Sequence, residues 1–142
     1  MYVTKAPKMK ILIDTNVLIS AALNSSGTPF KAFVKAVSLP NQGVICEQNI
    51  DELRRIFNKK FPDKLRALDT FLAYSMLTLQ VVPIPESGYE SEKQVRDKDD
   101  RTILRAAIAA DVDLIITGDK DLLEADLDSP EVLTPAQFIE KY

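Results

Sequence analysis

Three short apolar runs constrain the fold of this chain more than any other feature. They are Ile11–Ile13, Val44–Cys46 and Leu114–Ile116, and none alternates between apolar and polar residues. This pattern is typical of strands that are covered on both faces, as in a parallel sheet. Helical patterns separate the runs, which implies right-handed crossovers between parallel strands. We therefore predict an α/β fold, a three-layer α/β/α domain with a central, mostly parallel sheet.

Apolar spacing and the positions of Gly and Pro predict the other elements. Residues 86–98 are polar and are predicted to form a loop. We expect residues 1–8 to form an N-terminal tail and residues 9–142 to form a single domain, because a chain of 142 residues suits one domain. The predicted helices cover residues 17–22, 30–37, 48–58, 62–76, 99–110 and a short segment from 135, and the further strands cover 79–84 and, at an edge, 131–134.

The chain has no histidine, which restricts its chemistry. Ser-His-Asp and Cys-His nucleophilic pairs are excluded, and so are most zinc sites, which need imidazole or several thiolates. The one cysteine, Cys46, cannot form an internal disulfide, so a reducing cytoplasm is the expected location. No apolar stretch reaches the roughly 18 residues that span a bilayer, and we see no secretory signal, so we expect no membrane association.

Four acidic residues lie where predicted elements begin or end, and they carry the functional signal. Carboxylates do not gather without a cation, because each raises the pKa of its neighbours and resists desolvation. In folds of this class, ligands bind beyond the carboxyl ends of the strands. Carboxylates with water select Mg²⁺ or Mn²⁺, so convergence of these side chains would make a hard-metal site. The four residues are Asp14, Glu52, Asp100 and Asp119.

Each of the four also has a purely structural explanation. Asp14 and Asp119 each follow a predicted strand and could only cap the next helix. Asp100 lies on the apolar face of a helix that Asp97 is placed to cap, but a carboxylate at a helix N-terminus is also favoured by the backbone dipole. Glu52 flanks the apolar stripe of its helix and could pair with a neighbouring arginine. The combination of all four favours a shared site more than any one of them does.

The net charge of −3 does not imply a polyanionic partner, so nucleic-acid binding would need a local basic patch. Lys5, Lys8 and Lys10 form one candidate near the N-terminus. A solvated helix surface and a frayed terminus are the simpler explanations of such charges. The other candidate lies on and after the predicted helix 48–58, and consists of Arg54, Arg55, Lys59, Lys60, Lys64 and Arg66.

The order of the acidic motifs resembles the PIN domain, and most closely the VapC-like toxins of bacteria and archaea. The likeness covers residues from about 9 to 135. It rests on four motifs in this order: Asp14-Thr15-Asn16 after a strand, Glu52-Leu53 early in a helix, Asp100 seven residues before Ala107, and Thr117-Gly118-Asp119 after a strand.

The resemblance implies a role for each matching residue. The four acids would form the catalytic cluster, with Asp14, Asp100 and Asp119 as metal ligands. Asn16 would steady the first aspartate, and Thr117 would supply a hydroxyl near the metal. The family likeness also implies that Asp121 is a further acid behind the ligands. Cys46 stands where relatives often have serine or threonine, which implies a weaker cap for the helix of Glu52.

In function, the resemblance implies a Mg²⁺- or Mn²⁺-dependent endoribonuclease that is the toxin of a toxin–antitoxin pair. It also implies an RNA substrate, a small antitoxin protein as partner, and a homodimer or higher oligomer. Arg54, Arg55, Lys59 and Lys60 then become candidates for contact with RNA. The residues themselves do not choose between one and two metal ions, or between RNA and DNA.

Two other functions fit parts of the pattern. A catalytically silent PIN-fold module could bind nucleic acid or protein, although degenerate relatives lose acids and this chain retains all four. A phosphoaspartate protein, either a receiver or a haloacid-type phosphatase, is the second alternative. The phosphatase normally has Asp-x-Asp after its first strand, whereas Asp14 is followed by Thr15 and Asn16. A cleavage assay with magnesium would separate the first alternative, and a covalent phosphoryl label on Asp14 would support the second.

Overall fold

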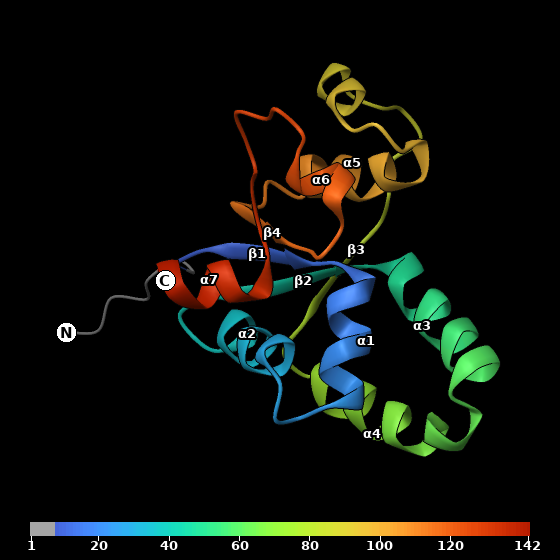
Figure 1. Cartoon of the computed structure of the whole chain (residues 1–142). Helices are drawn as coiled ribbons and strands as arrows, with labels where there is room; N and C mark the ends of the chain where they lie inside the picture. The colour runs from blue at the N-terminus through green and yellow to red at the C-terminus, as the bar shows by residue number, and fades with distance from the viewer. Residues whose placement is uncertain (1–7) are drawn as a thin grey trace.

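The protein is built on a five-stranded sheet in which every neighbouring pair of strands is parallel. The computed structural model describes residues 8–142, so most of the predicted tail, with Lys5, lies outside the described residues. The strand order is β3-β2-β1-β4-β5 (Figure 1), which confirms the predicted α/β class. The strands are β1 (Lys10–Ile13), β2 (Gln42–Cys46), β3 (Gln80–Val82), β4 (Leu114–Ile116) and β5 (Glu131–Leu133).

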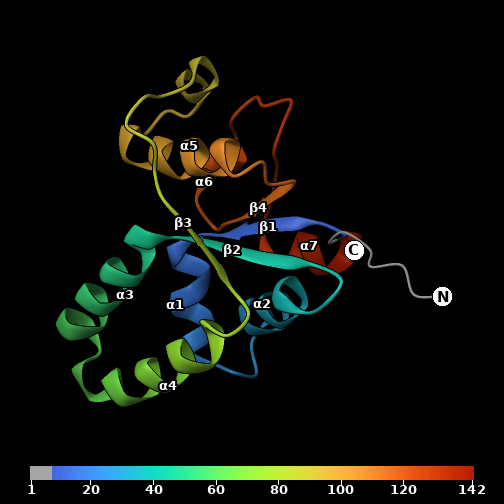
Figure 2. The ribbon, with the colours of Figure 1, turned by 180° about the vertical axis from the view of Figure 1, so that it is seen from behind.

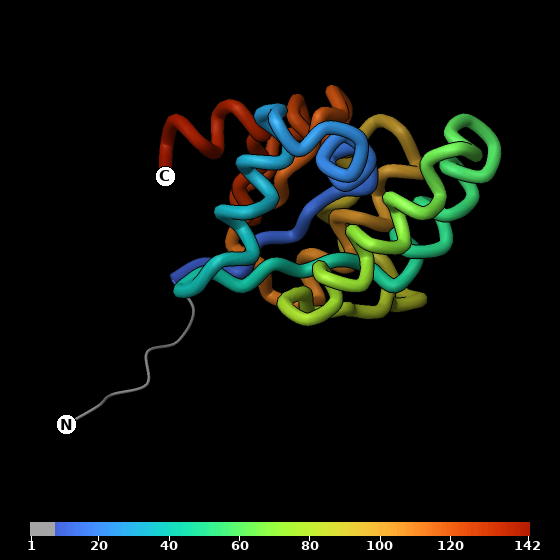
Figure 3. The backbone as a smooth tube through the Cα atoms, turned by 90° about the horizontal axis from the view of Figure 1, so that it is seen from below, coloured from blue at the N-terminus to red at the C-terminus, as the bar shows by residue number. Residues whose placement is uncertain are grey.

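Helices cover both faces of the sheet and complete three layers (Figures 1 and 2). One face carries α1 (Thr15–Leu23), α2 (Thr28–Val37), α3 (Glu47–Lys60), α4 (Leu65–Ser75) and α7 (Pro135–Lys141). The other face carries α5 (Arg101–Ala109) and α6 (Lys120–Leu123). Figure 3 shows α3 and α4 lying side by side. Within residues 8–142, no helix combines the length and the apolar character needed to cross a membrane.

The central strands send alternate side chains into two separate cores, as the pleat of a strand requires. In β1, Ile11 and Ile13 join the core under the five helices, where Phe57 and Phe138 are also fully buried. Leu12 points to the opposite core, which α5 and α6 cover. Both faces of the central strands are therefore apolar, and this explains why their sequences do not alternate.

The segment that was predicted to be a polar loop has more structure than its composition indicates. It contains the 3-10 turn η2 (Glu90–Gln94) and leads into a second turn, η3 (Lys98–Asp100). The predicted helix 99–110 begins two residues later, at Arg101, so Asp100 belongs to the turn before α5. The short helix α6 was not predicted, and a further 3-10 turn, η1 (Pro62–Lys64), precedes α4.

A buried ion pair explains the order in this segment. Glu92 is buried, and its Oε1 lies 2.9 Å from Nη2 of Arg105 on α5. Arg105 also donates through Nη1 to the carbonyl oxygens of Pro85 and Glu86, at 3.2 and 3.3 Å. Hydrogen bonds from Arg105 lower the pKa of Glu92 below its usual range. The two partners are 13 residues apart, so local sequence patterns did not reveal the pair.

Candidate metal centre

Asp14 lies where β1 ends and α1 begins. Its backbone N donates to the Ile116 oxygen at 3.0 Å, which continues the ladder between β1 and β4 by one bond. Its side chain caps α1, because Oδ1 accepts from the Thr15 backbone N at 2.8 Å. The residue is only 7% exposed. The predicted capping role of Asp14 is therefore present, and it leaves the second carboxylate oxygen free for other contacts.

Two neighbouring side chains hold that second oxygen. Oδ2 of Asp14 accepts from Nδ2 of Asn16 at 3.0 Å and from the hydroxyl of Thr117 at 2.7 Å. The Asn16 side-chain oxygen accepts from the Gly118 backbone N at 2.9 Å, which ties this residue to the end of β4. Thr117 is fully buried, and its hydroxyl also accepts from the Asp119 backbone N at 3.0 Å. The Asp14 carboxylate is thus fixed from two strand ends.

The charge on Asp14 is opposed by its surroundings. Burial raises its pKa above the ordinary value, and the negative charges of Asp119 and Glu52 raise it further. The hydrogen bonds from Thr117 and from the Thr15 backbone oppose this rise without cancelling it. The buried carboxylate therefore lies close to two other acids, and no ion pair gives it a positive partner among residues 8–142, which favours the approach of a cation.

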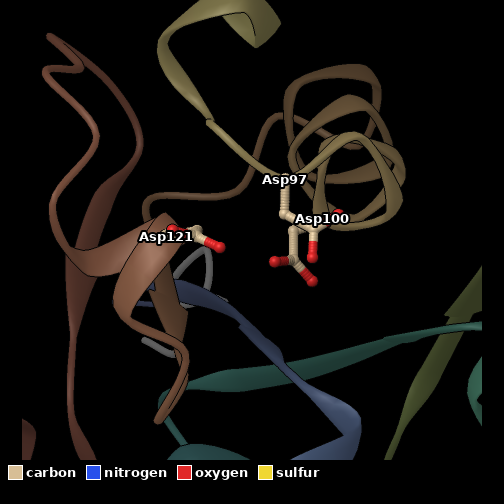
Figure 4. A group of neighbouring side chains, drawn as sticks. All are labelled: Asp97, Asp100 and Asp121. Atoms are coloured by element: carbon tan, nitrogen blue, oxygen red, sulfur yellow. The ribbon is translucent and has the colours of Figure 1, made fainter.

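A second group of acids faces Asp14 from the other core. Asp119 is the N-cap of α6, and its Oδ1 accepts from the Asp121 backbone N at 2.8 Å. Figure 4 shows Asp121 facing Asp97 and Asp100, which come from the turn before α5. One carboxylate oxygen from each of these three residues lies within 4.8 Å of the others. This is close enough for strong mutual repulsion between the three charges.

Asp100 shows the clearest sign of a missing positive charge. Its Oδ2 is buried, and it has no hydrogen-bond partner among residues 8–142. Burial, hydrogen bonding with the Asp119 carboxyl, and the charges of Asp119, Asp97 and Asp14 together raise the pKa of Asp100 to about 7. A buried, unpartnered carboxylate oxygen is costly in a folded protein. A cation among these acids would remove that cost.

Glu52 lies at the rim of the site. Its Oε2 accepts from the hydroxyl of Thr15 at 3.4 Å, which is a long hydrogen bond. The same hydroxyl accepts from Nδ2 of the buried Asn49. The Asn49 side-chain oxygen accepts from the Cys46 backbone N at 2.6 Å, so Asn49 strengthens the helix start where a weak cap was implied. Sequence analysis missed Asn49, although its place three residues after Cys46 is the capping-box position.

The donor set fits Mg²⁺ or Mn²⁺. The available ligands are carboxylate oxygens, which are hard, and two in this neighbourhood, Oδ2 of Asp100 and Oδ1 of Asp121, are buried without a hydrogen-bond partner among residues 8–142. Cys46 ends β2 nearby, but burial and the charges of Asp14, Glu47 and Glu52 raise the pKa of its thiol to about 12. Since thiolates and not thiols bind metals, Cys46 does not make this a site for a softer ion.

The predicted site residues therefore fall into one neighbourhood. Asp14, Asp100 and Asp119 converge, Glu52 lies at their rim, and Asn16 and Thr117 hold Asp14. Asp121 lies beside Asp100. Asp97 was expected only to cap the next helix. It does accept from the Asp99 backbone N at 3.0 Å, and it also belongs to the acidic group.

A cavity of about 390 Å³ opens beside Asp119 and gives access to the site. Its walls are partly apolar, from Val17, Pro29 and Pro135, while Asn16 and Ser20 supply polar groups. Four of the basic residues named in the sequence, Arg54, Arg55, Lys59 and Lys60, lie on α3. Among the described residues, Arg54 forms an exposed ion pair with Asp69, and no ion pair joins the α3 residues to the acidic site.

Known proteins resemble this chain in sequence and in fold. The family model described as PIN domain matches residues 10–121. The uncharacterized protein MJ1680 of Methanocaldococcus jannaschii is 30% identical over an alignment 149 residues long. The alignment covers 95% of this chain and 92% of that protein. A chain from the crystal structure of VapBC2 from Rickettsia felis, bound to a DNA fragment from its promoter, has a TM-score of 0.61 at 17% identity. That match covers 88% of this chain and 97% of the other. PAE2754 from Pyrobaculum aerophilum has a TM-score of 0.59 at 15% identity, over 96% and 97% of the two chains.

Proposed function

The chain belongs to the PIN domain family, as the order of its motifs predicted, and on that premise we propose that it is a Mg²⁺- or Mn²⁺-dependent endoribonuclease. The observation that carries this proposal is the buried, unpartnered oxygen of Asp100 beside Asp14 and Asp119. Acids in such a place destabilise a fold unless they hold a cation.

Asp14, Asp100 and Asp119 are the proposed metal ligands. Thr117 and Asn16 orient the Asp14 carboxylate through short hydrogen bonds, so that little reorganisation is needed when a cation binds. Asp121 keeps the helix start of α6 in place through its backbone bond to Asp119. When bound, the divalent ion supplies positive charge that stabilises the attacking and leaving oxygens of a phosphodiester.

Glu52 is the proposed residue for orienting the attacking water. It stands at the rim of the site, and among the described residues its carboxylate accepts only the long bond from Thr15, so most of its acceptor capacity is free for a solvent molecule. In-line attack by water needs no 2′-hydroxyl, so this chemistry does not select RNA over DNA. RNA as the substrate rests on the family likeness.

We also propose a small antitoxin protein as partner, and assembly into a homodimer or higher oligomer. The likeness to VapBC2 of Rickettsia felis supports the partner. An apolar groove of about 470 Å³ between α1, α2 and α4, lined by Phe30, Phe33, Phe71 and Tyr74 among others, suits the apolar face of a partner helix. We expect the protein to form a stable complex with such an antitoxin, and we expect that complex not to cleave RNA.

The proposal is tested with Asp14→Asn and Asp119→Asn. Each change removes one proposed ligand charge, and each should lower manganese-dependent cleavage of single-stranded RNA by at least about 100-fold. Both should also abolish the rise in melting temperature that manganese gives the wild-type protein. Circular dichroism checks that the fold is intact. Asp51→Asn, a neighbouring acid that is exposed on α3, is the matched control and should leave both readouts unchanged.

Wild-type levels of cleavage and of manganese stabilisation in both variants would overturn the assignment. Manganese stabilisation without cleavage of any RNA by the wild-type protein would instead support the silent binding module.

A further inference from the structure

Arg96 is the basic side chain that the structure brings to the acidic site. Its Nη2 lies 2.7 Å from Oδ1 of Asp121. The pair has no hydrogen-bond geometry, since the same Asp121 oxygen is buried without a hydrogen-bond partner among residues 8–142. Within that range, Arg96 is the one cation in ion-pair contact with the acidic group of Asp97, Asp100 and Asp121.

The backbone under Arg96 is firmly held, whereas its side chain is largely exposed. The preceding residue, Val95, is fully buried, and its carbonyl oxygen accepts from Nε of Arg101 at 2.8 Å. The Glu92–Arg105 pair fixes the same segment to α5. In contrast, the Arg96 side chain is 82% exposed and touches the site only through its tip. A firmly held backbone keeps the exposed guanidinium close to the site, where a ligand can reach it.

The present contact of Arg96 is weakly bound. An ion pair with one exposed partner and without a hydrogen bond contributes little to stability. Three acids gathered within 4.8 Å attract any available cation, and among residues 8–142 the Arg96 guanidinium is the one in ion-pair contact with them. Once another cation offsets the charge of the acids, the attraction between Arg96 and Asp121 falls, and the guanidinium can turn to a different anion.

We propose that Arg96 is a substrate-positioning residue that binds a phosphodiester of the RNA strand at the rim of the metal site. This rests on the proposed nuclease function. The chain carries a net charge of −3, so a polyanion needs a local cation to approach a site lined by acids. The planar guanidinium fork matches the oxygens of a phosphodiester, and it can make two charge-assisted hydrogen bonds there.

The basic residues of α3 are the competing candidates for this role. They lie on the helix layer opposite α5 and α6 (Figure 1), and Arg54 is engaged with Asp69. Arg96 is carried by residues 86–98, which lie on the same side as α6 and Asp121. The proximity of Arg96 to the acids therefore favours it as the contact nearest to the cleaved bond.

The test measures RNA affinity and metal affinity separately. Binding of a labelled, short single-stranded RNA is followed by fluorescence anisotropy with calcium in place of magnesium, and a gel confirms that the RNA stays intact. Arg96→Ala should weaken RNA binding about 10-fold, the effect of losing one charged hydrogen bond. It should also reduce the slope of log affinity against log salt by about 0.7. Arg96→Lys should fall between the two.

Manganese affinity should not fall in Arg96→Ala. With Arg96 gone, Asp121 loses its competing cation, so manganese should bind as tightly as in the wild type or more tightly. The manganese concentration at half-saturation is followed by melting temperature without RNA. Lys93→Ala is the matched control, because Lys93 is an exposed cation in the same segment and pairs only with Glu90. It should leave both affinities at wild-type values.

Three outcomes would overturn the proposal. They are unchanged RNA affinity in Arg96→Ala, an equal loss in Lys93→Ala, and weaker manganese binding in Arg96→Ala, which would mean a structural role. If the wild-type protein binds manganese and RNA and only the Arg96 effect is missing, the nuclease assignment stands without it. If the wild-type protein binds neither, the proposed function and the role of Arg96 fail together.

Discussion

The two halves of the acidic site are held in different ways. At the strand ends, both oxygens of Asp14 accept hydrogen bonds, from the Thr15 backbone, Asn16 and Thr117. Beside α5 and α6, Asp100 has a buried oxygen without a partner, and its pKa is raised to about 7. Hydrogen bonds therefore fix the position of Asp14 in the first half, whereas in the second half the charge of Asp100 is not compensated among the described residues.

This difference suggests a division of labour between the halves. The hydrogen bond from Thr117 can orient the Asp14 carboxylate before a cation arrives. The backbone bond from Asp14 to Ile116 fixes the two strand ends that carry these residues. The acids beside α5 and α6 gain most from a cation, since nothing among the described residues neutralises Asp100. Losing a ligand from either half should stop catalysis. Stability should fall when the Thr117 hydroxyl that holds Asp14 is removed, and it should rise when the Asp100 charge is removed.

The largest expected effect separates the ligands from their acidic neighbour. Asp100→Asn should lower RNA cleavage by at least about 100-fold, because it removes a proposed ligand charge. Asp97→Asn is the matched change in the same turn, and asparagine can still cap the Asp99 backbone. It should lower cleavage less than about 10-fold. Equal losses in the two variants, measured as initial rates at saturating manganese, would place the ion among Asp97, Asp100 and Asp121 instead.

The next effect concerns the strand-end half alone. Thr117→Val removes the hydroxyl that donates to Asp14 and accepts from the Asp119 backbone, and both partners stay buried or half-buried. We expect the free energy of unfolding to fall by about 1–3 kcal/mol, measured by chemical denaturation. Thr70→Val makes the same change on exposed α4, where the hydroxyl only meets the Arg66 carbonyl, and should cost less. A loss no greater than in this control would mean that Asp14 does not depend on Thr117.

The smallest effect is a pH dependence that isolates the other half. The pKa of Asp100 is raised in the folded protein to about 7, from 3.8 when unfolded, so the folded state holds the proton more tightly. Its contribution to stability is fully present below about pH 4 and is lost as the pH rises through about 7. Because Asp100 is partly solvated, the change is smaller than the full shift implies.

We therefore expect metal-free Asp100→Asn to be more stable than the wild type at about pH 8, with a smaller advantage at about pH 5. Chemical denaturation at both pH values measures the difference in free energy of unfolding between the two proteins. The pKa of Glu92 is lowered and gives the opposite pH dependence, but both proteins share it, so it cancels in this difference. Adding Mg²⁺ at the higher pH should stabilise the wild type and reduce the gap. An advantage that does not depend on pH would show that the Asp100 carboxyl is already ionised and compensated.

Much of the architecture could be predicted because its causes are local. The run Ile11–Ile13 in β1 is apolar throughout, as are the matching runs in β2 and β4, so their composition alone predicts that they are buried. Strand ends in a parallel sheet share an edge, so Asp14 and Asp119 could be placed together without coordinates. Helical spacing predicted Asp100 inside the next helix, whereas the structure places it in the 3-10 turn just before α5.

The parts that could not be predicted depend on distant contacts. Residues 86–98 looked like a loop, because nothing near Glu92 signals that Arg105 will bury with it. The positions of Asp97 and Arg96 follow from that pair, so they were missed as members of the site. Asn49 was missed for a different reason. The N-cap residue of its helix is Cys46, and cysteine is not one of the usual capping residues. The sequence therefore showed no sign that Asn49 accepts from the Cys46 backbone.

The pairing of β1 with β4 has a consequence for how such a site can vary. Ile13 lies opposite Ile116, and the next backbone bond of the ladder brings Asp14 to Thr117. Deleting one residue from either strand would exchange the side chains of the two cores and separate these two residues at the same time. Insertions and deletions in relatives should therefore not be found in these strands.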